Sequence, residues 1–123
     1  DQASIHPEEF IRMDGREVFR FAVKRVPVVI RELLDSSGMG PEEIDYFVLH
    51  QANRRIVESV AKRLDAEIEK FPMNLEEYGN TSSASIPILL DEMNRDGRLK
   101  SRQTIVLAGF GAGLSWGAAI LKW

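Results

Sequence analysis

The sequence predicts an α/β fold in which helices cover both faces of a mixed sheet. Three segments carry apolar residues three and four positions apart, the spacing of amphipathic helices. Short apolar runs rich in β-forming residues alternate with them, and a glycine-rich turn joins the last two runs. Strands that alternate with helices and close on a hairpin are typical of a layered α/β fold.

The first helix is expected over residues 16–36. Its apolar positions are Phe19, Val23, Val26, Ile30, Leu33 and Leu34. Pro27 lies inside this pattern and is expected to kink or divide the helix, because proline lacks the backbone N–H. The Ser- and Gly-rich run 36–41 should end it.

The central part predicts a buried strand at 46–49, followed by a helix that Asn53 could cap. Residues 68–73 are expected to form another short strand. A polar turn at 78–83 leads into a third helix. Its inward positions should be Ile86, Leu89, Leu90 and Met93.

The C-terminal part predicts a hairpin. Asp96 and Gly97 should end the third helix, and residues 104–108 read as a strand. Glycines at 109–113 turn the chain, and 114–123 should return as the second strand.

Composition narrows the functional classes. The chain has 123 residues, enough for one core, with 44% hydrophobic and 28% charged residues and a net charge of −3. This charge argues against a general nucleic-acid binder. The absence of cysteine excludes a disulfide framework and a thiolate zinc site, and no metal site is expected. No segment reaches the ~20 apolar residues of a membrane span, and residues 1–7 do not resemble a signal peptide, so a cytoplasmic protein is expected.

Two polar motifs could carry chemistry. His50 ends a predicted strand, where α/β sheets place their sites, and could act as a general base or a hydrogen-bond donor. From position alone, a loop histidine held by hydrogen bonds is the simpler interpretation. Asn80 follows Gly79 and could donate to a developing oxyanion, although a helix-capping loop would use the same residue types.

Two further features have both a structural and a functional interpretation. The glycine-rich run 109–113 could be a hairpin turn or a backbone that binds an oxyanion; a strand follows it, which argues against a dinucleotide fingerprint. The helix at 53–64 carries four basic residues against one acidic residue. Arg55 and Lys62 are seven apart and share a face, which could receive an anionic partner or simply be solvated.

Together these motifs resemble one family. Residues 50–53 (HQAN), 79–82 (GNTS), 109–113 (GFGAG) and 116–117 (WG) are similar to the C-terminal domain of β-ketoacyl-acyl-carrier-protein synthase III. The resemblance extends to the start of the first helix at 13–19. It implies a thiolase-like fold of two similar halves. Residues 1–123 would be most of the C-terminal half. That half would contain a mixed sheet of the five-stranded type, and the first strands of this sheet are expected to be absent from residues 1–123.

The family's catalytic triad is Cys-His-Asn, and His50 and Asn80 match two of its members. The cysteine belongs to the N-terminal half, so this segment alone is expected to be inactive. The resemblance further implies that Phe110 lines the pocket, that Ala112 contributes an oxyanion-binding N–H, and that Asn53 lies near pantetheine. Arg55 and Lys62 would dock the carrier protein.

The implied activity is the condensation of an acyl group from acyl-coenzyme A with malonyl-acyl carrier protein, with loss of carbon dioxide, at the start of fatty-acid biosynthesis. The implied partners are acyl carrier protein, acyl-coenzyme A and a second subunit of a homodimer, without nucleic acid, membrane or a cofactor beyond the thioester substrates. Two alternatives remain open: a related acyltransferase of secondary metabolism, and a non-catalytic module that binds carrier protein.

Overall fold

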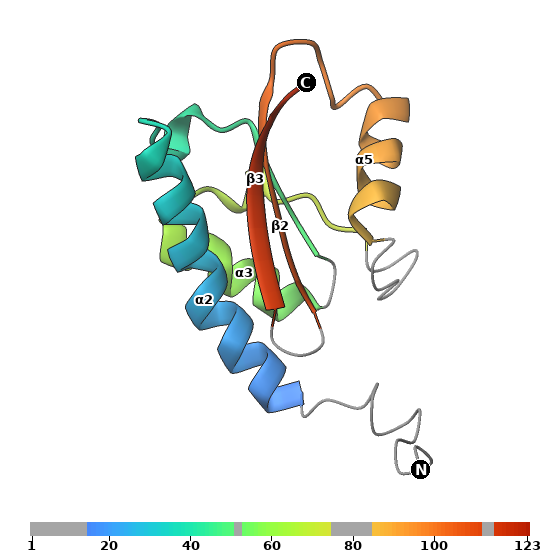
Figure 1. The fold of residues 1–123 in the computed structure, drawn as a ribbon. Helices are drawn as coiled ribbons and strands as arrows, with labels where there is room; N and C mark the ends of the chain where they lie inside the picture. Colours follow the sequence, from blue (N-terminus) through green and yellow to red (C-terminus); the bar gives the residue numbers. More distant parts are fainter. Residues whose placement is uncertain (1–14, 51–52, 75–84, 112–114) are drawn as a thin grey trace, which may run out of the picture.

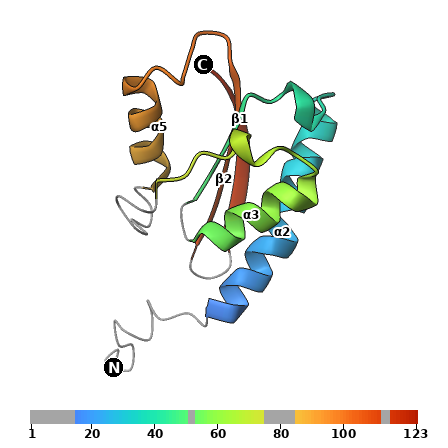
Figure 2. The ribbon, with the colours of Figure 1, turned by 180° about the vertical axis from the view of Figure 1, so that it is seen from behind.

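The computed structural model describes residues 15–50, 53–74, 85–111 and 115–123. Within them, a three-stranded sheet lies between a pair of helices and a single helix (Figures 1 and 2). The elements in chain order are α2 (Gly15–Ser36), η2 (Pro41–Glu43), β1 (Tyr46–Leu49), α3 (Arg54–Leu64), η3 (Ile68–Lys70), α5 (Ser85–Arg95), β2 (Thr104–Gly111) and β3 (Ser115–Lys122).

The sheet is mixed, as predicted. β1 runs parallel to β2, with Leu49 opposite Ala108. β2 pairs with β3 in the antiparallel sense, with Phe110 opposite Trp116. The order β1-β2-β3 places the hairpin partner β3 on the far side of β2 from β1. Parallel strands need a long crossover, and α3 and α5 lie in the segment that connects β1 to β2.

Alternate side chains of the strands pack into two separate cores. Phe47 and Leu49 of β1 join the core beneath α2 and α3, whereas Val48 joins the one beneath α5. The first core also contains Ile30 of α2 and the second contains Leu89 of α5, each fully buried. Helices therefore cover both faces of the sheet, which confirms the predicted fold class (Figure 1).

Helix α2 is a single element despite its internal proline. Pro27 is buried within the 22-residue helix and does not divide it, which corrects half of the expectation for this position. The helix ends as predicted: Gly38 has φ +69°, and the N–H of Met39 donates to the carbonyl of Leu34 at 2.9 Å. A glycine is favoured there because its φ lies in the left-handed region.

The strand expected at 68–73 is not formed. This segment starts with the 3₁₀ turn η3, in which the N–H of Phe71 donates to Ile68 O at 2.9 Å instead of to a neighbouring strand. Phe71 is buried and stacks on Phe47, with ring centroids 4.7 Å apart, while Ile68 is 38% exposed. Phe71 and Met73 both pack against the core beneath α2 and α3, so the apolar residues of this segment do not alternate between two faces of a sheet.

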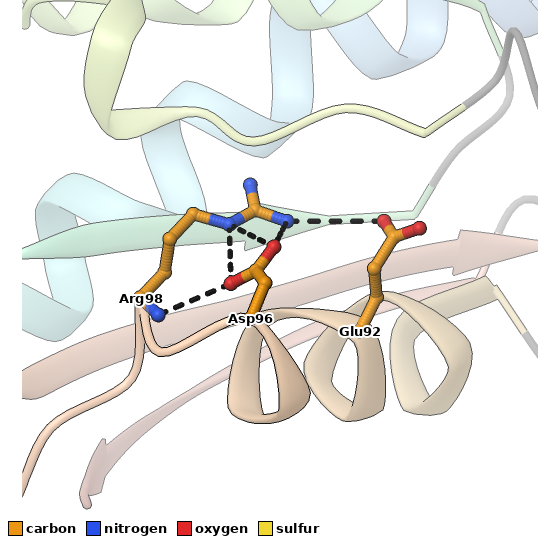
Figure 3. Close-up of polar contacts among 3 residues, drawn as sticks. All are labelled: Glu92, Asp96 and Arg98. Carbon is orange, nitrogen blue, oxygen red and sulfur yellow. Dashed lines mark hydrogen bonds and ion pairs between the residues drawn. The ribbon is translucent and has the colours of Figure 1, made fainter.

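The end of α5 is held by a small ionic cluster (Figure 3). The guanidinium of Arg98 contacts both carboxylate oxygens of Asp96, with Nε 2.9 Å from Oδ2, and Nη2 lies 3.8 Å from Oε1 of Glu92. The hydrogen bond from Arg98 lowers the pKa of Asp96. Gly97, at φ +84°, supplies the left-handed turn between them. This cluster lies where the chain leaves α5, and the N–H groups of Arg98 and Leu99 also donate there to the carbonyl of Met93.

None of the helices in the described residues combines the length and the apolar character needed to cross a membrane.

Candidate functional site

The carboxyl end of β1 places His50 at the edge of the sheet. The N–H of His50 donates to the carbonyl of Ala108 on β2 at 2.9 Å, so the parallel pairing extends one residue beyond β1. The chain then leaves the sheet and enters α3. Parallel strands end at a common edge, and open α/β sheets bind their ligands there. The backbone therefore fixes His50 at the predicted position for a site.

The imidazole of His50 is half-buried, and this environment suits a neutral side chain. Desolvation lowers its pKa from the ordinary value of 6.5, because burial disfavours the charged form. A neutral imidazole carries one N–H and one acceptor nitrogen. At neutral pH, His50 can thus donate a hydrogen bond to an oxygen that gains negative charge, without first losing a proton.

The glycine-rich end of β2 approaches the start of α5 beside this histidine. A Cβ atom at Gly109 would lie 3.9 Å from Cδ1 of Ile86, the second residue of α5. Gly109 directly follows Ala108, whose carbonyl holds His50. The segment after β1, the end of β2 and the start of α5 therefore converge on one edge of the sheet. These are the described ends of the three motifs that the sequence singled out.

Several predicted site residues are not placed by the structure. Asn80 and Ala112 lie outside the described residues. Phe110 is placed through its backbone alone, opposite Trp116 in the β2–β3 ladder. The structure thus brings the flanking segments together and leaves the roles of these three residues as predictions.

Asn53 caps α3, as predicted from its position. Its Oδ1 atom accepts a hydrogen bond from the N–H of Ile56 at 2.9 Å, and its backbone is extended at φ −161° and ψ 159°. This bond satisfies one of the unpaired N–H groups at the helix start. The cap uses one lone pair of the amide oxygen, and the Nδ2 group carries the hydrogen-bond donors that a ligand such as pantetheine could meet.

A pair of substitutions separates these two uses of Asn53. Asn53→Asp keeps a capping oxygen but loses the amide donor, whereas Asn53→Ala loses both. We expect Asn53→Ala to lower the free energy of unfolding by about 1 kcal/mol, and Asn53→Asp to leave it nearly unchanged. If Asn53 also contacts pantetheine, as the family resemblance implies, both should raise KM for coenzyme A thioesters in a full-length protein. A KM unchanged in Asn53→Asp would contradict a role in thioester binding.

The basic helix α3 presents exposed cations beside α2. Arg55 and Lys62 are both exposed. The guanidinium carbon of Arg55 lies 5.0 Å from the ring centroid of Phe19 on α2. The sequence pattern assigned Phe19 only to the helix core, because spacing shows which face a residue occupies and not what lies across from it. This cation–ring contact is the feature that sequence analysis missed.

No group of three His, Asp or Glu residues that could hold a metal ion occurs among the described residues.

Comparison with known proteins supports a specific family. Residues 34–123 match the family model described as 3-oxoacyl-[acyl-carrier-protein (ACP)] synthase III C terminal. The β-ketoacyl-[acyl-carrier-protein] synthase III of Porphyra umbilicalis is 53% identical over 113 residues, and that of Gloeobacter violaceus is 52% identical over the same length. Each alignment covers 92% of this chain; it covers 35% of the first relative and 34% of the second.

Solved structures agree. The crystal structure of 3-oxoacyl-[acyl-carrier-protein] synthase III from Aquifex aeolicus superimposes with a TM-score of 0.88 at 44% identity, over 91% of this chain and 36% of that one. The corresponding Pseudomonas aeruginosa structure gives 0.87, also at 44% identity, over 91% of this chain and 35% of that one. This chain thus spans about a third of the length of its relatives.

A mixed sheet covered on both faces, with a histidine at its carboxyl edge and these structural neighbours, defines a thiolase-like α/β domain. The chain belongs to the family of the 3-oxoacyl-[acyl-carrier-protein] synthase III C-terminal domain.

Proposed function

We propose that this chain is the C-terminal part of a condensing acyltransferase. The enzyme would join an acyl group from acyl-coenzyme A to malonyl-acyl carrier protein, with loss of carbon dioxide, and so initiate fatty-acid biosynthesis. The observation that carries the proposal is the half-buried His50 with a lowered pKa, held beside the glycine-rich end of β2. The match to relatives named for the acyl-carrier-protein synthase reaction supports it.

The first half-reaction needs a cysteine that this chain lacks. A thiolate from the N-terminal half would attack the carbonyl carbon of the acyl thioester. The carbon–sulfur bond to coenzyme A then breaks, and coenzyme A leaves as its thiol after taking up a proton. A covalent acyl-enzyme divides one difficult transfer into two easier steps. The backbone N–H of Ala112 is proposed to hold the oxyanion during this exchange.

The second half-reaction uses the residues of this chain. When malonyl thioester loses carbon dioxide, the electron pair of the broken C–C bond moves into an enolate, and charge gathers on the thioester oxygen. His50 and Asn80 are proposed to donate hydrogen bonds to that oxygen. The enolate carbon then attacks the acyl carbonyl, and the cysteine leaves as a thiolate. The apolar ring of Phe110 would disfavour the charged malonyl carboxylate and favour its loss.

The same proposal assigns this chain to a larger enzyme with a second half, a second subunit and named partners. Residues 1–123 would be most of the C-terminal half, and the cysteine would come from an N-terminal half. The enzyme would act as a cytoplasmic homodimer, with acyl-coenzyme A and acyl carrier protein as partners and no cofactor beyond the thioesters. The relatives' greater length, about three times that of this chain, supports a second half.

Comparing the full-length protein with the isolated chain tests the proposal. The full-length protein should release carbon dioxide from malonyl-acyl carrier protein and form a β-ketoacyl product when acyl-coenzyme A is present. The isolated 123-residue chain should transfer no acyl group and form no β-ketoacyl product, because it has no cysteine to carry the acyl thioester. Condensation absent from the full-length protein while carrier-protein binding persists would favour a non-catalytic module instead.

Carrier-protein docking is proposed for the exposed cations of α3. In the full-length enzyme, reversing both Arg55 and Lys62 to glutamate should lower kcat/KM for malonyl-acyl carrier protein, and affect malonyl-coenzyme A much less. Exposed ion pairs contribute only about 0.2–1 kcal/mol each, so both changes are needed for a clear effect.

The loss should shrink as salt is raised, since screening weakens these interactions. Reversal of both Lys24 on α2 and Lys100 before β2, two exposed lysines, changes the net charge equally and is the control. Carrier-protein kinetics that match the parent at low salt would exclude the docking role.

A further inference from the structure

The first turn of α3 has an unusual charge arrangement. Arg54 and Arg55 open the helix, and the turn contains no acidic residue. A helix N-terminus carries partial positive charge, so cations are disfavoured there and acids are preferred. The Asn53 cap stabilises the helix start without neutralising this charge. The first turn of α3 therefore carries cations at a position where local helix stability favours acids.

Among the described residues, the guanidinium of Arg55 contacts the aromatic ring of Phe19 and not a carboxylate. Glu58 lies three residues further along the same helix, within ordinary reach of an intrahelical ion pair. Within the described part of the chain, Arg55 nevertheless forms no ion pair, and its guanidinium lies 5.0 Å from the centroid of Phe19. A ring attracts the cation through its face and leaves the guanidinium N–H groups able to bind an anion.

The ring itself is fixed in place. Phe19 is partly buried and packs against the core beneath α2 and α3. At the other end of the helix pair, Nη2 of Arg31 donates to the carbonyl of Arg63 at 2.6 Å. The N-terminal part of α2 thus contacts the N-terminal part of α3, and the C-terminal parts of the two helices contact each other. The two helices run side by side in the same direction (Figure 2). Two contacts therefore set the position of Phe19 relative to α3.

From these contacts we infer that Phe19 is a positioning residue, which presets the guanidinium of Arg55 for an anionic group on the carrier protein. The inference rests on the docking role proposed above. A long arginine side chain loses conformational freedom when it binds, and a ring that limits this freedom beforehand reduces the cost of binding. The exposed Arg55 then offers its planar fork to a carboxylate or phosphate in a fixed orientation.

The test is a double-mutant cycle in the full-length enzyme. Phe19→Leu removes the ring but keeps an apolar side chain, and Phe19→Tyr restores a ring. Arg55→Gln removes the cation. For each variant, kcat/KM is measured at low salt with malonyl-acyl carrier protein and with malonyl-coenzyme A, and the thermal midpoint reports folding.

Phe19→Leu should lower kcat/KM for malonyl-acyl carrier protein, relative to kcat/KM for malonyl-coenzyme A, about two- to fivefold. This is the range expected for an exposed cation–ring contact. Phe19→Tyr should restore the ratio. In the Arg55→Gln background, Phe19→Leu should cause no further change in the ratio. If Phe19→Leu proves unstable, Phe19→Met takes its place in the cycle.

The same loss in both backgrounds, or a loss that Phe19→Tyr does not reverse, would overturn the positioning role while leaving docking by Arg55 intact. An unchanged ratio in Arg55→Gln alone would overturn both roles. Intact condensation of small thioesters in that variant would still support the proposed reaction, so the two proposals fail separately.

Discussion

Replacing Asn80 by aspartate in the full-length enzyme is expected to slow malonyl decarboxylation by at least about 10²–10³-fold, the usual cost of losing one oxyanion donor. The two side chains have nearly the same shape, so packing should survive. What changes is the chemistry: an amide that donates becomes a carboxylate that repels the oxygen on which charge develops. Formation of the acyl-enzyme should continue, because it occurs before malonyl decarboxylation.

Separate measurements of carbon dioxide release and of acyl-enzyme formation distinguish these steps. Asn80→Ala serves as the matched variant, because it removes the donor without adding a charge and should be less impaired than Asn80→Asp. An Asn80→Asp enzyme that decarboxylates malonyl thioester at the parent rate would remove Asn80 from the triad. It would also weaken the condensing mechanism as a whole.

The elements that periodicity predicts best are those that bury one face. The pattern of α2 matched its observed bounds closely, and the apolar run at 46–49 was correctly predicted as a buried strand. The capping role of Asn53 also followed from the sequence, because the cap depends on the residue and its immediate neighbours. Such features are local, and local sequence contains the information that sets them.

The failures depend on contacts between distant segments. Residues 68–73 were expected as a strand from their composition, but they begin with a 3₁₀ turn, after which Phe71 stacks on the distant Phe47. The ring contact of Phe19 with Arg55 joins residues 36 positions apart, and spacing within one helix cannot reveal it. Likewise, the convergence of His50 with the end of β2 follows from the parallel register, which only the pairing of the strands establishes. Asn80, Ala112 and the side chain of Phe110 stay predictions.

Substitution of His50 is expected to have the second of the two largest effects. His50→Ala should slow decarboxylation about 10²–10³-fold by removing the other donor to the same oxygen. Because His50 and Asn80 are proposed to act on one atom, the combined variant should lose much less than the product of the single losses. Acyl-enzyme formation should also fall more with His50→Ala than with Asn80→Asp if the imidazole supports the cysteine thiolate.

The lowered pKa of His50 gives this prediction a second measurement. Desolvation puts the folded-state pKa below 6.5, so the unfolded chain binds the proton more readily than the folded protein. The stability contributed by neutral His50 is therefore complete above pH 6.5. It is lost as the pH falls from 6.5 through the folded-state pKa, and the loss levels off below that value.

His50→Gln is the matched control, since it keeps an N–H donor and does not titrate. It should retain more decarboxylation than His50→Ala, and its thermal midpoint should decline less than that of the parent as the pH falls below 6.5. An NMR titration that assigns His50 by its absence in His50→Gln should give a midpoint below 6.5. A midpoint at or above 6.5 would contradict the lowered pKa of His50. A midpoint well above neutral pH would leave the imidazole largely charged and would exclude the neutral-donor role.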